Sequence, residues 1–368
     1  MRLAYDLRYA TDHFPGIGSH AWALGSALAE RGRFDEIAFL WDPRATNSRF
    51  PVESLRAHPR VRWHELSVPA LSWQTAHATG SWLERSGVDA FFSPFWLNPE
   101  RTRVPCVLTL HDVLALLPKG GLSTPRRWVF GWALGRAVRA AAVVTSSRFS
   151  REEILRHTSI PAERLHMVPL GLASPAAGGR RPSRAPEPPF ALVVGTNRVH
   201  KGHDTLAAVW RRFAGQPPLA LVGAGANAPS RFSLGELSAS GLAVTALGPV
   251  APDKLEWLYA HATLVLVPSR YEGFGLPLLE AALRGAAVIA SDIPALRETG
   301  DAVARFVPVG DVAAWERAIR ELAADEGERQ RMAAAGQQRA AEYDYARCAE
   351  RVEAILEGVA LGPTAVTA

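Results

Sequence analysis

Residues 269–281, with the sequence SRYEGFGLPLLEA, decide how the second half of this chain folds. An apolar run precedes them. Gly273 and Gly275 permit a tight bend in which the backbone comes close to a ligand, and Pro277 suits the first position of a helix. The stretch therefore predicts a buried strand, a glycine-rich turn and a helix that begins at Pro277.

This turn separates two carboxylates by eight positions. Glu272 falls on the loop before the helix, and Glu280 falls one turn inside it. The free N–H groups at a helix start favour phosphate, which would repel both carboxylates, so their natural targets are hydroxyl groups. The pattern predicts a pocket for a sugar joined to a nucleotide diphosphate. The alternative is that both are solvated carboxylates on the flanks of the helix.

The length of 368 residues predicts two domains, and an apolar content of 48% is that of an ordinary globular protein. Short apolar runs alternate with helical stretches, which predicts an α/β fold with parallel sheets covered on both faces. We expect strands at 3–7, 36–41, 90–92, 107–110, 143–146, 190–194, 219–223, 244–247, 263–268 and 287–291, and helices at 20–31, 126–142, 150–157, 255–260, 277–284 and 315–358.

A stretch rich in Pro, Gly, Ser and Arg interrupts this alternation at residues 171–189. It has little to bury and predicts a linker. The expected organisation is two α/β halves with a cleft between them. Ligands of such sheets bind at the carboxyl ends of the strands.

Positive charge is concentrated in the first half of the chain. Residues 1–170 hold 21 of the 41 Lys and Arg residues but only 15 of the 36 Asp and Glu residues. Two interpretations stay open: a surface that faces anionic lipid or an anionic acceptor, and a solvated arginine-rich surface. Because no basic run or recognition helix stands out, a nucleic-acid partner is not expected.

Cys106 and Cys348 lie far apart in the sequence, which predicts a reducing compartment and no disulfide framework. No run of about 18 apolar residues occurs, and the N-terminal residues do not have the pattern of a secretory signal. The expected location is the cytoplasm, and peripheral contact with the inner face of the cell membrane stays open.

Basic residues follow the strand expected at 190–194. Arg198 and Lys201 stand in the segment from Gly195 to Gly202, where the carboxyl end of the strand would place them. Such side chains can neutralise a leaving diphosphate. A surface turn with two charges is the alternative.

Two motifs in the first half also follow strands. Gly16-Ile17-Gly18 predicts a tight turn before the helix at 20–31, which invites phosphate, although a plain strand–helix turn also explains it. His111-Asp112 follows the strand expected at 107–110 and would point into the cleft. That position favours a functional histidine over a buried structural one.

These motifs, in this order, resemble the retaining GT-B glycosyltransferases, and among them glycosyltransferase family four. The Glu-x7-Glu pattern at 272–280 carries the resemblance with Gly16-Ile17-Gly18, His111-Asp112, Ser146-Ser147-Arg148-Phe149-Ser150, Val168-Pro169-Leu170-Gly171 and Lys201-Gly202. The resemblance implies two facing Rossmann-like domains with an interdomain cleft. Residues 1–170 would bind the acceptor and residues 190–342 the nucleotide sugar, and a last helix at 343–368 would return to the N-terminal domain.

The resemblance also implies roles for individual residues. Glu272 would contact the transferred sugar, Glu280 would hold the ribose hydroxyls, and Lys201 and Arg198 would meet the diphosphate. His111 would bind the sugar or shape the reaction centre. The remaining implied positions are Asp112, which orients His111 or lies on the acceptor side, and donor-binding backbone at Gly16, Gly18, Gly273, Phe274, Gly275 and Leu276.

The implied protein is a retaining hexosyltransferase, similar to mannosyltransferases. It would move a sugar from a nucleotide-diphosphate sugar to a glycan or lipid-linked acceptor in bacterial surface polysaccharide or lipopolysaccharide synthesis. No Asp-x-Asp motif stands at a strand end and no His/Cys cluster has metal spacing, so neither a metal nor a cofactor is expected. Two alternatives stay open: a nucleotide-sugar epimerase or hydrolase on the same fold, and a non-catalytic partner that binds a sugar nucleotide.

The sequence departs from the family in two places. Relatives carry an arginine in this segment either just after the glycine or directly before the lysine. Here Arg198 lies between these two positions, and His200 stands directly before Lys201. Tyr343-Asp344-Tyr345 stands where relatives often carry Phe-Ser-Trp.

Residues 125–134 (PRRWVFGWAL) mix arginines with large aromatic residues. One interpretation is a helix that lies on a membrane surface. The favoured one is an ordinary amphipathic helix that packs its aromatic side chains into the core, because Trp128, Phe130 and Trp132 do not fall on one narrow stripe.

Overall fold

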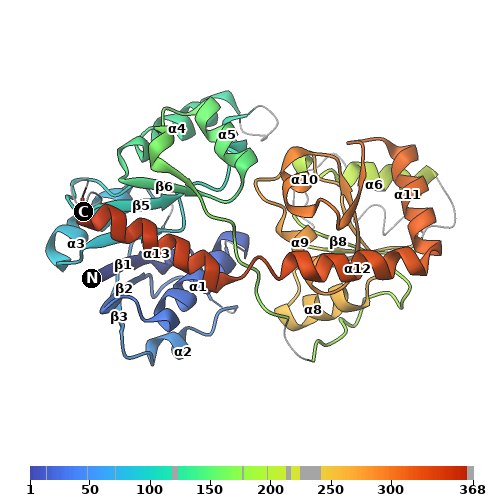
Figure 1. The fold of residues 1–368 in the computed structure, drawn as a ribbon, viewed down its shortest axis with the longest axis horizontal. Coiled ribbons are helices and arrows are strands. Elements are labelled where there is room, and N and C mark those ends of the chain that lie inside the picture. The colour runs from blue at the N-terminus through green and yellow to red at the C-terminus, as the bar shows by residue number, and fades with distance from the viewer. Residues whose placement is uncertain are drawn as a thin grey trace. The chain divides into compact units, whose positions relative to one another are not determined.

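The computed structural model of the protein describes residues 1–13, 15–47, 49–70, 72–117, 123–175, 178–196, 198–212, 217–223 and 242–362. The chain forms two compact α/β units (Figure 1). Unit 1 contains the described residues between 1 and 117, between 123 and 173 and between 343 and 362. Unit 2 contains those between 174 and 342.

Unit 1 is built on a parallel sheet with the strand order β3-β2-β1-β4-β5-β6-β7. The chain adds β2 and β3 on one side of β1 and adds β4 to β7 on the other. The order therefore reverses between β1 and β4, where parallel sheets bind their ligands. The strands are β1 (Arg2–Asp6), β2 (Glu36–Trp41), β3 (Val61–Glu65), β4 (Ala90–Ser93), β5 (Cys106–Thr109), β6 (Ala142–Thr145) and β7 (Leu165–Met167).

Helices cover both faces of this sheet, because successive strand residues point to opposite sides. Leu3 and Tyr5 pack into one core with α1 and α13, whereas Ala4 packs into a second core with α3, α4 and α5. Arg31 on α1 donates from Nε to Glu353 on α13 at 2.9 Å. The helices are α1 (Pro15–Arg31), α2 (Val52–Arg56), α3 (Trp73–Ser86), α4 (Thr124–Leu134), α5 (Arg148–His157) and α13 (Tyr345–Leu361).

Unit 2 repeats this plan with the parallel strand order β10-β9-β8-β11-β12-β13. The order reverses between β8 and β11. The strands are β8 (Ala191–Val194), β9 (Leu219–Val222), β10 (Val244–Gly248), β11 (Leu264–Val267), β12 (Ala287–Ser291) and β13 (Ala304–Val307). The helices are α6 (His203–Arg212), α8 (Pro252–His261), α9 (Leu276–Leu283), α10 (Pro294–Gly300), α11 (Val312–Ala324) and α12 (Glu326–Ala340).

The core of unit 2 joins one face of its sheet to α6 and α11. Trp315 of α11 is fully buried and packs with Trp210 of α6 against strand residues such as Val193 and Ile289. The alternate strand residues, among them Leu192 and Val265, are buried on the other face, where α9 contacts β11 and β12.

The α/β class and the parallel sheets predicted from the sequence are confirmed, but several predicted helix bounds are wrong. The helix expected at 20–31 begins at Pro15, whose fixed φ favours a helix start. The helix expected at 126–142 ends at Leu134, before Gly135, and a short 3-10 turn, Ala137–Arg139, leads to β6. The helix expected at 150–157 is capped by Ser147, whose Oγ accepts from the Ser150 N–H at 2.9 Å.

The helical stretch expected at 315–358 is divided into α11, α12 and α13. Two aspartates begin new helices within it. Asp325 Oδ1 accepts from the N–H of Glu328 at 2.8 Å, and Asp344 Oδ1 accepts from the N–H of Arg347 at 2.7 Å. Such caps satisfy N–H groups that a helix start leaves without a partner, so each favours a new helix over continuation of the preceding one.

Two helix glycines in unit 1 should respond to alanine in opposite ways. A Cβ on Gly80 in α3 would lie 1.6 Å from the carbonyl oxygen of Glu100, whereas a Cβ on Gly358 in α13 would meet nothing within 4 Å. Alanine is the better helix former by about 0.5–1 kcal/mol. We expect Gly358→Ala to raise the free energy of unfolding by about that amount and Gly80→Ala to lower it by about 1–3 kcal/mol through overpacking.

Urea unfolding of the two variants followed by circular dichroism measures this difference. Equal stability of Gly80→Ala and the wild type would contradict the packing described here.

Candidate functional site

The loops after β8 and β11 meet at the carboxyl edge of the unit 2 sheet, where the strand order reverses. After β8 the chain forms the short 3-10 turn Val199–Lys201, and after β11 it turns through Glu272 into α9. Lys201 Nζ donates to the two carboxylate oxygens of Glu272 at 2.7 and 3.0 Å. Their side chains are only 18% and 11% exposed, so a largely buried ion pair joins the two loops.

Further contacts fix these loops to each other. Arg270 donates from Nη1 and Nη2 to the carboxylate of Asp204 at 2.7 and 2.6 Å, and its backbone N–H donates to the carbonyl oxygen of His200 at 2.7 Å. Ser269 Oγ donates to Glu272 Oε1 at 2.6 Å. A bidentate arginine–carboxylate pair is strong and fixed in orientation, so Glu272 and Lys201 are held in place before any ligand binds.

Gly202 explains why the two loops can pass so closely. Its φ is +66°, and a Cβ there would lie 2.0 Å from the carbonyl oxygen of Pro268 on the β11 loop. Only glycine satisfies both conditions without strain. The Lys201-Gly202 pair in the sequence thus combines a cation with the backbone that places it.

Glu280 lies on α9 and is held by a separate set of contacts. Tyr259 of α8 donates its hydroxyl to Glu280 Oε2 at 2.8 Å. Arg284 donates to the carbonyl oxygen of Glu280 at 3.0 Å and forms a bidentate pair with Glu256 at 2.9 and 2.7 Å. Burial raises the pKa of Glu280, and the Tyr259 hydroxyl and the Arg284 charge only partly offset that effect.

The glycine turn before α9 is also constrained by its neighbours. Gly275 has φ +102°, and a Cβ there would lie 2.6 Å from Leu296 Cδ2. Phe274 is buried, and its carbonyl oxygen accepts from Thr299 Oγ1 at 3.1 Å. α9 begins at Leu276, one residue before the predicted start, and Gly273 is half-buried. The turn thus presents a fixed backbone at the helix start.

The basic residues at this edge differ in their charge. Arg198 is exposed at the start of the turn Val199–Lys201. Burial, and then the Lys201 charge, lowers the pKa of His200 to about 4 and that of His203 to about 4. Both histidines are therefore neutral near pH 7, and the positive charge of this loop comes from Lys201 and Arg198.

In unit 1, the prediction of a turn at Gly16-Ile17-Gly18 is wrong, because these residues lie inside α1. Gly18 is buried, and a Cβ there would lie 3.0 Å from the carbonyl oxygen of Tyr9 and 3.2 Å from that of Thr11. Close packing of α1 on the loop after β1 therefore favours glycine here. A Cβ on Gly16 would meet nothing within 4 Å, so only Gly16 leaves open space.

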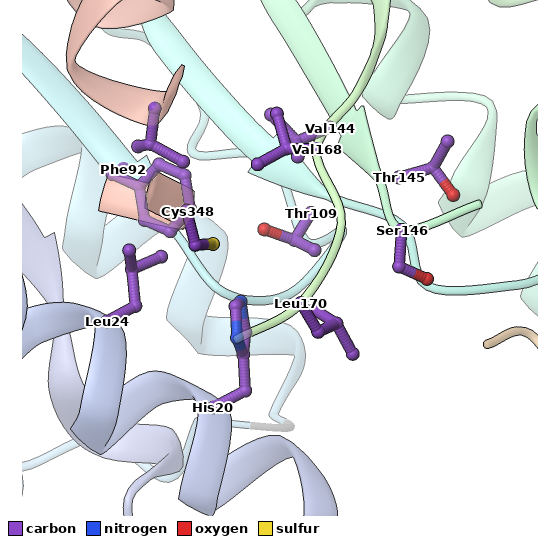
Figure 2. A pocket seen from close by; sticks show the side chains of 11 residues that line it. His20, Leu24, Phe92, Thr109, Val144, Thr145, Ser146, Val168, Leu170 and Cys348 are labelled. Carbon is purple, nitrogen blue, oxygen red and sulfur yellow. The ribbon is translucent and has the colours of Figure 1, made fainter. Parts of the chain in front are cut away.

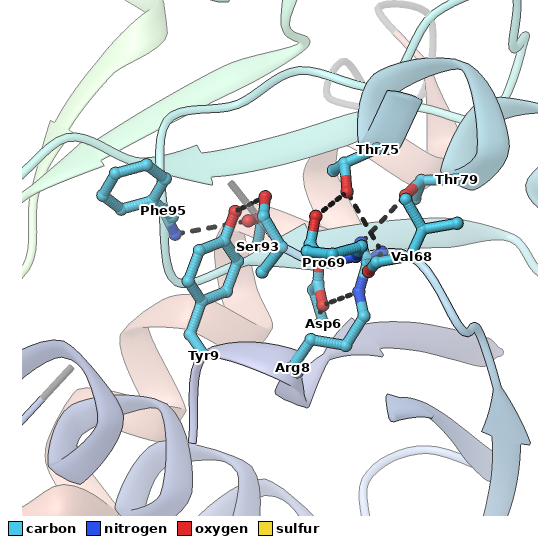
Figure 3. Close-up of polar contacts among 10 residues, drawn as sticks. Asp6, Arg8, Tyr9, Val68, Pro69, Thr75, Thr79, Ser93 and Phe95 are labelled. Atoms are coloured by element: carbon cyan, nitrogen blue, oxygen red, sulfur yellow. Dashed lines mark hydrogen bonds and ion pairs between the residues drawn. The ribbon is translucent and has the colours of Figure 1, made fainter. Parts of the chain in front are cut away.

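A buried ion pair fixes the loop after β1 (Figure 3). Arg8 donates from Nε and Nη2 to the two carboxylate oxygens of Asp6 at 2.8 and 2.6 Å, and from Nη2 to Thr79 Oγ1 of α3 at 2.9 Å. The two charged side chains are 0% and 3% exposed. Loss of one partner from such a pair costs about 3–5 kcal/mol, so the interaction holds the carboxyl end of β1 rigidly.

His111 lies after β5 and packs against His20 of α1. Their ring centroids are 5.4 Å apart and the rings meet edge to face. Burial and the neighbouring His111 lower the pKa of His20 to about 3, and burial lowers that of His111 to about 4. Asp112 Oδ1 accepts from the backbone N–H of Leu114 at 2.8 Å, where the short 3-10 turn Leu114–Leu116 begins.

A small pocket lies beside His20 at the carboxyl ends of β5 and β6 (Figure 2). Thr109, Thr145 and Ser146 contribute hydroxyls to it. Within the described part of the chain, these hydroxyls and His20 Nδ1 are buried and have no hydrogen-bond partner. The pocket therefore presents four polar atoms in an apolar surround completed by Leu24, Phe92, Val144, Val168, Leu170, Cys348 and Val352.

The predicted site residues thus fall into separate groups. Lys201 and Glu272 are brought into contact, and Glu280 is held on the following helix. Sequence analysis missed Tyr259 and Asp204, because nothing in the local pattern links residues on separate helices to Glu280 or Arg270. It also missed His20, whose only signal was its place at the expected helix start. Among the described residues, no group of three or more His, Cys, Asp or Glu side chains is arranged to hold a metal ion.

Known protein families match the chain along most of its length. Residues 15–173 match the family described as "Glycosyltransferase Family 4", and residues 180–339 match the family described as "Glycosyl transferases group 1". Together these matches span most of the chain. The chain belongs to the GT-B glycosyltransferases.

Three similar proteins illustrate the relationship. A D-inositol 3-phosphate glycosyltransferase from Xylanimonas cellulosilytica is 28% identical, and the alignment covers 87% of this chain and 86% of that protein. O-antigen chain mannosyltransferase B from Escherichia coli is 28% identical over 57% of this chain and 58% of its own length. The crystal structure of Anabaena HepE in complex with UDP-glucose has a TM-score of 0.72 and 19% identity, and covers 97% of this chain and 99% of that one.

Replacement of Glu280 by a neutral residue should stabilise the ligand-free protein. Because burial disfavours the charged carboxylate, Glu280→Gln is expected to raise the melting temperature of the ligand-free protein at pH 7. Thermal unfolding of the wild type and the variant measures this. Glu152→Gln, at an exposed position on α5, is the control and should change the free energy of unfolding by less than about 0.5 kcal/mol. A lower melting temperature for Glu280→Gln would contradict the inference that the charged Glu280 carboxylate destabilises the ligand-free protein.

His20 should make stability depend on pH below neutrality. The folded protein holds the His20 pKa near 3, whereas an unfolded histidine has a pKa of about 6.5. The unfolded state therefore binds more protons, so stability is complete above about pH 6.5 and falls as the pH is lowered toward 4. We expect His20→Asn to reduce this slope and exposed His77→Asn to leave it unchanged, measured by melting temperature against pH. Equal slopes in all three proteins would contradict the prediction.

Proposed function

We propose that this glycosyltransferase moves a hexose from a nucleotide-diphosphate sugar to an acceptor hydroxyl, with retention at the anomeric carbon and without a metal ion or other cofactor. The observation that carries the proposal is the Lys201–Glu272 pair at the point of strand-order reversal in unit 2. At this edge, the Lys201 cation can bind the diphosphate of such a donor, and the Glu272 carboxylate can accept hydrogen bonds from its sugar hydroxyls.

Each donor-binding residue has a proposed task that follows from its environment. Lys201, with Arg198 at the exposed end of the loop, stabilises the departing diphosphate. Glu272 accepts hydrogen bonds from the transferred sugar. Glu280 accepts from the ribose hydroxyls; its carboxylate already accepts from the Tyr259 hydroxyl, and burial raises its pKa, so further hydrogen-bond donors from a ligand would stabilise the charged form. Backbone groups of Gly273, Phe274, Gly275 and Leu276 lie at the start of α9, where N–H groups suit phosphate or sugar oxygens.

Unit 1 contributes the remaining proposed positions. His111 contacts the sugar, and its low pKa keeps the ring neutral, so that it can donate from one nitrogen and accept at the other. Asp112 is the proposed acceptor-side residue, and its bond to Leu114 fixes the loop that carries both. Of the two glycines, Gly16 at the open start of α1 is favoured as donor-binding over Gly18, whose surroundings are filled by protein.

The proposed reaction breaks the bond between the anomeric carbon and the diphosphate oxygen and forms a bond from that carbon to the acceptor oxygen. The acceptor proton passes to the departing phosphate on the same face. Retention is favoured without a covalent intermediate, because Glu272 already binds Lys201 and the Ser269 hydroxyl, and a carboxylate held in this way is a poor nucleophile.

The proposed setting is bacterial surface polysaccharide or lipopolysaccharide synthesis, in the cytoplasm at the inner face of the cell membrane. The similarity to an O-antigen chain mannosyltransferase supports this setting and favours a mannosyl-type donor. A glycan or a lipid-linked acceptor would supply the hydroxyl. In the part of the chain that the structure describes, no helix is long and apolar enough to cross a membrane.

A thermal-shift screen against UDP, GDP, dTDP and ADP and their sugars, with a chelator present, tests the donor site. One nucleotide should stabilise the protein, by about 2.7 kcal/mol at a concentration of 100 times its Kd. Lys201→Ala and Glu280→Gln should lose this stabilisation, and Lys254→Ala on α8 should keep it. If no nucleotide stabilises the protein, or if Lys201→Ala responds like the wild type, the donor site is wrong.

The products formed with the selected sugar nucleotide test the reaction class. Nuclear magnetic resonance of the new linkage should show the anomeric configuration of the donor. An inverted linkage would contradict retention. Conversion or hydrolysis of the donor with no acceptor dependence would favour an epimerase or hydrolase, and donor binding without turnover would favour a non-catalytic partner.

A further inference from the structure

Helix α4 of unit 1 exposes two tryptophans that the donor site does not explain. Trp128 is 77% exposed and Trp132 is 70% exposed. They lie four residues apart, so they project from the same side of the helix. The expectation that this helix packs its aromatic residues into the core is wrong for both tryptophans. It holds for Phe130, which meets Trp96 with ring centroids 4.8 Å apart.

The exposed side of α4 carries both tryptophans, and basic side chains lie beside it. The tryptophans share it with Thr124, Pro125 and Gly135, which are also exposed and which follow the same helical spacing. We call these five residues the α4 outer face. Neighbouring exposed apolar groups with polar residues around them are typical of an interaction site.

The sequence around this face is strongly basic. Residues 113–151 contain seven Lys and Arg residues and no Asp or Glu. Arg127 is half-buried on α4, and Arg139 is exposed just after it. Arg136 stacks over the Trp132 ring, with 5.3 Å between the guanidinium carbon and the ring centroid, and pairs with Glu100. Exposed aromatic rings and basic side chains are therefore presented together by α4 and the short 3-10 turn that follows it.

This combination selects one kind of partner. Tryptophan is apolar over its rings and donates from one N–H, so it suits the boundary between water and hydrocarbon. Arg and Lys beside it attract a negatively charged surface. A neutral glycan would use the rings but not the charge excess, and a second copy of this basic face would be repelled by it.

We propose that the α4 outer face docks onto an anionic lipid bilayer, with Trp128 and Trp132 inserted at the headgroup level and Arg127 and Arg139 above the lipid phosphates. The contact is peripheral, because α4 is an eleven-residue helix that lies on the protein surface. This inference specifies the surface that makes the membrane contact proposed above. It rests on the proposed function only for the identity of the membrane.

Vesicle co-sedimentation of the full chain, without donor or acceptor, tests the proposal. The wild type should bind vesicles that mix phosphatidylcholine with phosphatidylglycerol, and should bind pure phosphatidylcholine vesicles weakly. Added salt should weaken binding, since the Debye length falls from about 10 Å at 0.1 M to about 3 Å at 1 M. Lipids brominated near the headgroup should quench tryptophan fluorescence of the bound protein.

Paired variants separate the two parts of the surface. Trp128→Ser with Trp132→Ser should abolish vesicle binding and quenching. Arg127→Gln with Arg139→Gln should weaken binding by about fivefold for each charge removed. The charge-matched control is Arg317→Gln with Arg351→Gln, at exposed positions on α11 and α13, and it should bind like the wild type. Unchanged melting temperatures confirm that all variants fold.

Several results would overturn the proposal. They are equal binding to both vesicle types, no binding by the wild type, or full binding by the double tryptophan variant. Two other results would assign the face to a different occupant: protection of the tryptophans by soluble glycans alone, or concentration-dependent dimers that the tryptophan variant does not form. None of these results affects the nucleotide screen, so a failure here leaves the proposed glycosyl transfer standing.

Discussion

One constraint organises both units: the first strand of each sheet lies in its interior, with later strands added on either side. In unit 1 this strand is β1, and in unit 2 it is β8. The loops that leave the first strand and its later neighbour must then separate, which opens the carboxyl edge of the sheet at that point. Both units have a buried or nearly buried ion pair beside this point, Asp6–Arg8 in unit 1 and Lys201–Glu272 in unit 2.

The two ion pairs differ in how they are enclosed. Asp6 and Arg8 are inaccessible and satisfied by Thr79 and by each other, so the pair has a structural role in fixing the loop after β1. Lys201 and Glu272 keep 18% and 11% of their side-chain surface exposed and lie on loops that glycine and arginine contacts hold together. A partly accessible pair retains charge that a ligand can contact, and this difference supports the proposal that the donor binds to unit 2.

Several ionisable groups in both units are placed where desolvation disfavours their charged forms. Among the contacts described, the Glu280 carboxylate accepts from one hydroxyl, that of Tyr259, and contacts no cation directly. Its pKa is raised. His20 and His111 are neutral near pH 7 for the same reason. Such groups cost stability in the free protein, and pKa values shifted in this way are found more often at functional sites than elsewhere.

The α/β class, the alternation of strands and helices and the short motifs at strand ends could be predicted from the order of residues alone, because they depend on local periodicity and on residue type. The glycine turn before α9 and the basic loop after β8 were identified in this way. Contacts between residues that are distant in the chain depend on tertiary structure, as those of Lys201 with Glu272 and of Tyr259 with Glu280 do. The exposure of Trp128 and Trp132 depends on it as well. Helix periodicity assigns a residue to a side of its helix, but only the packing of neighbouring elements decides whether that side is covered.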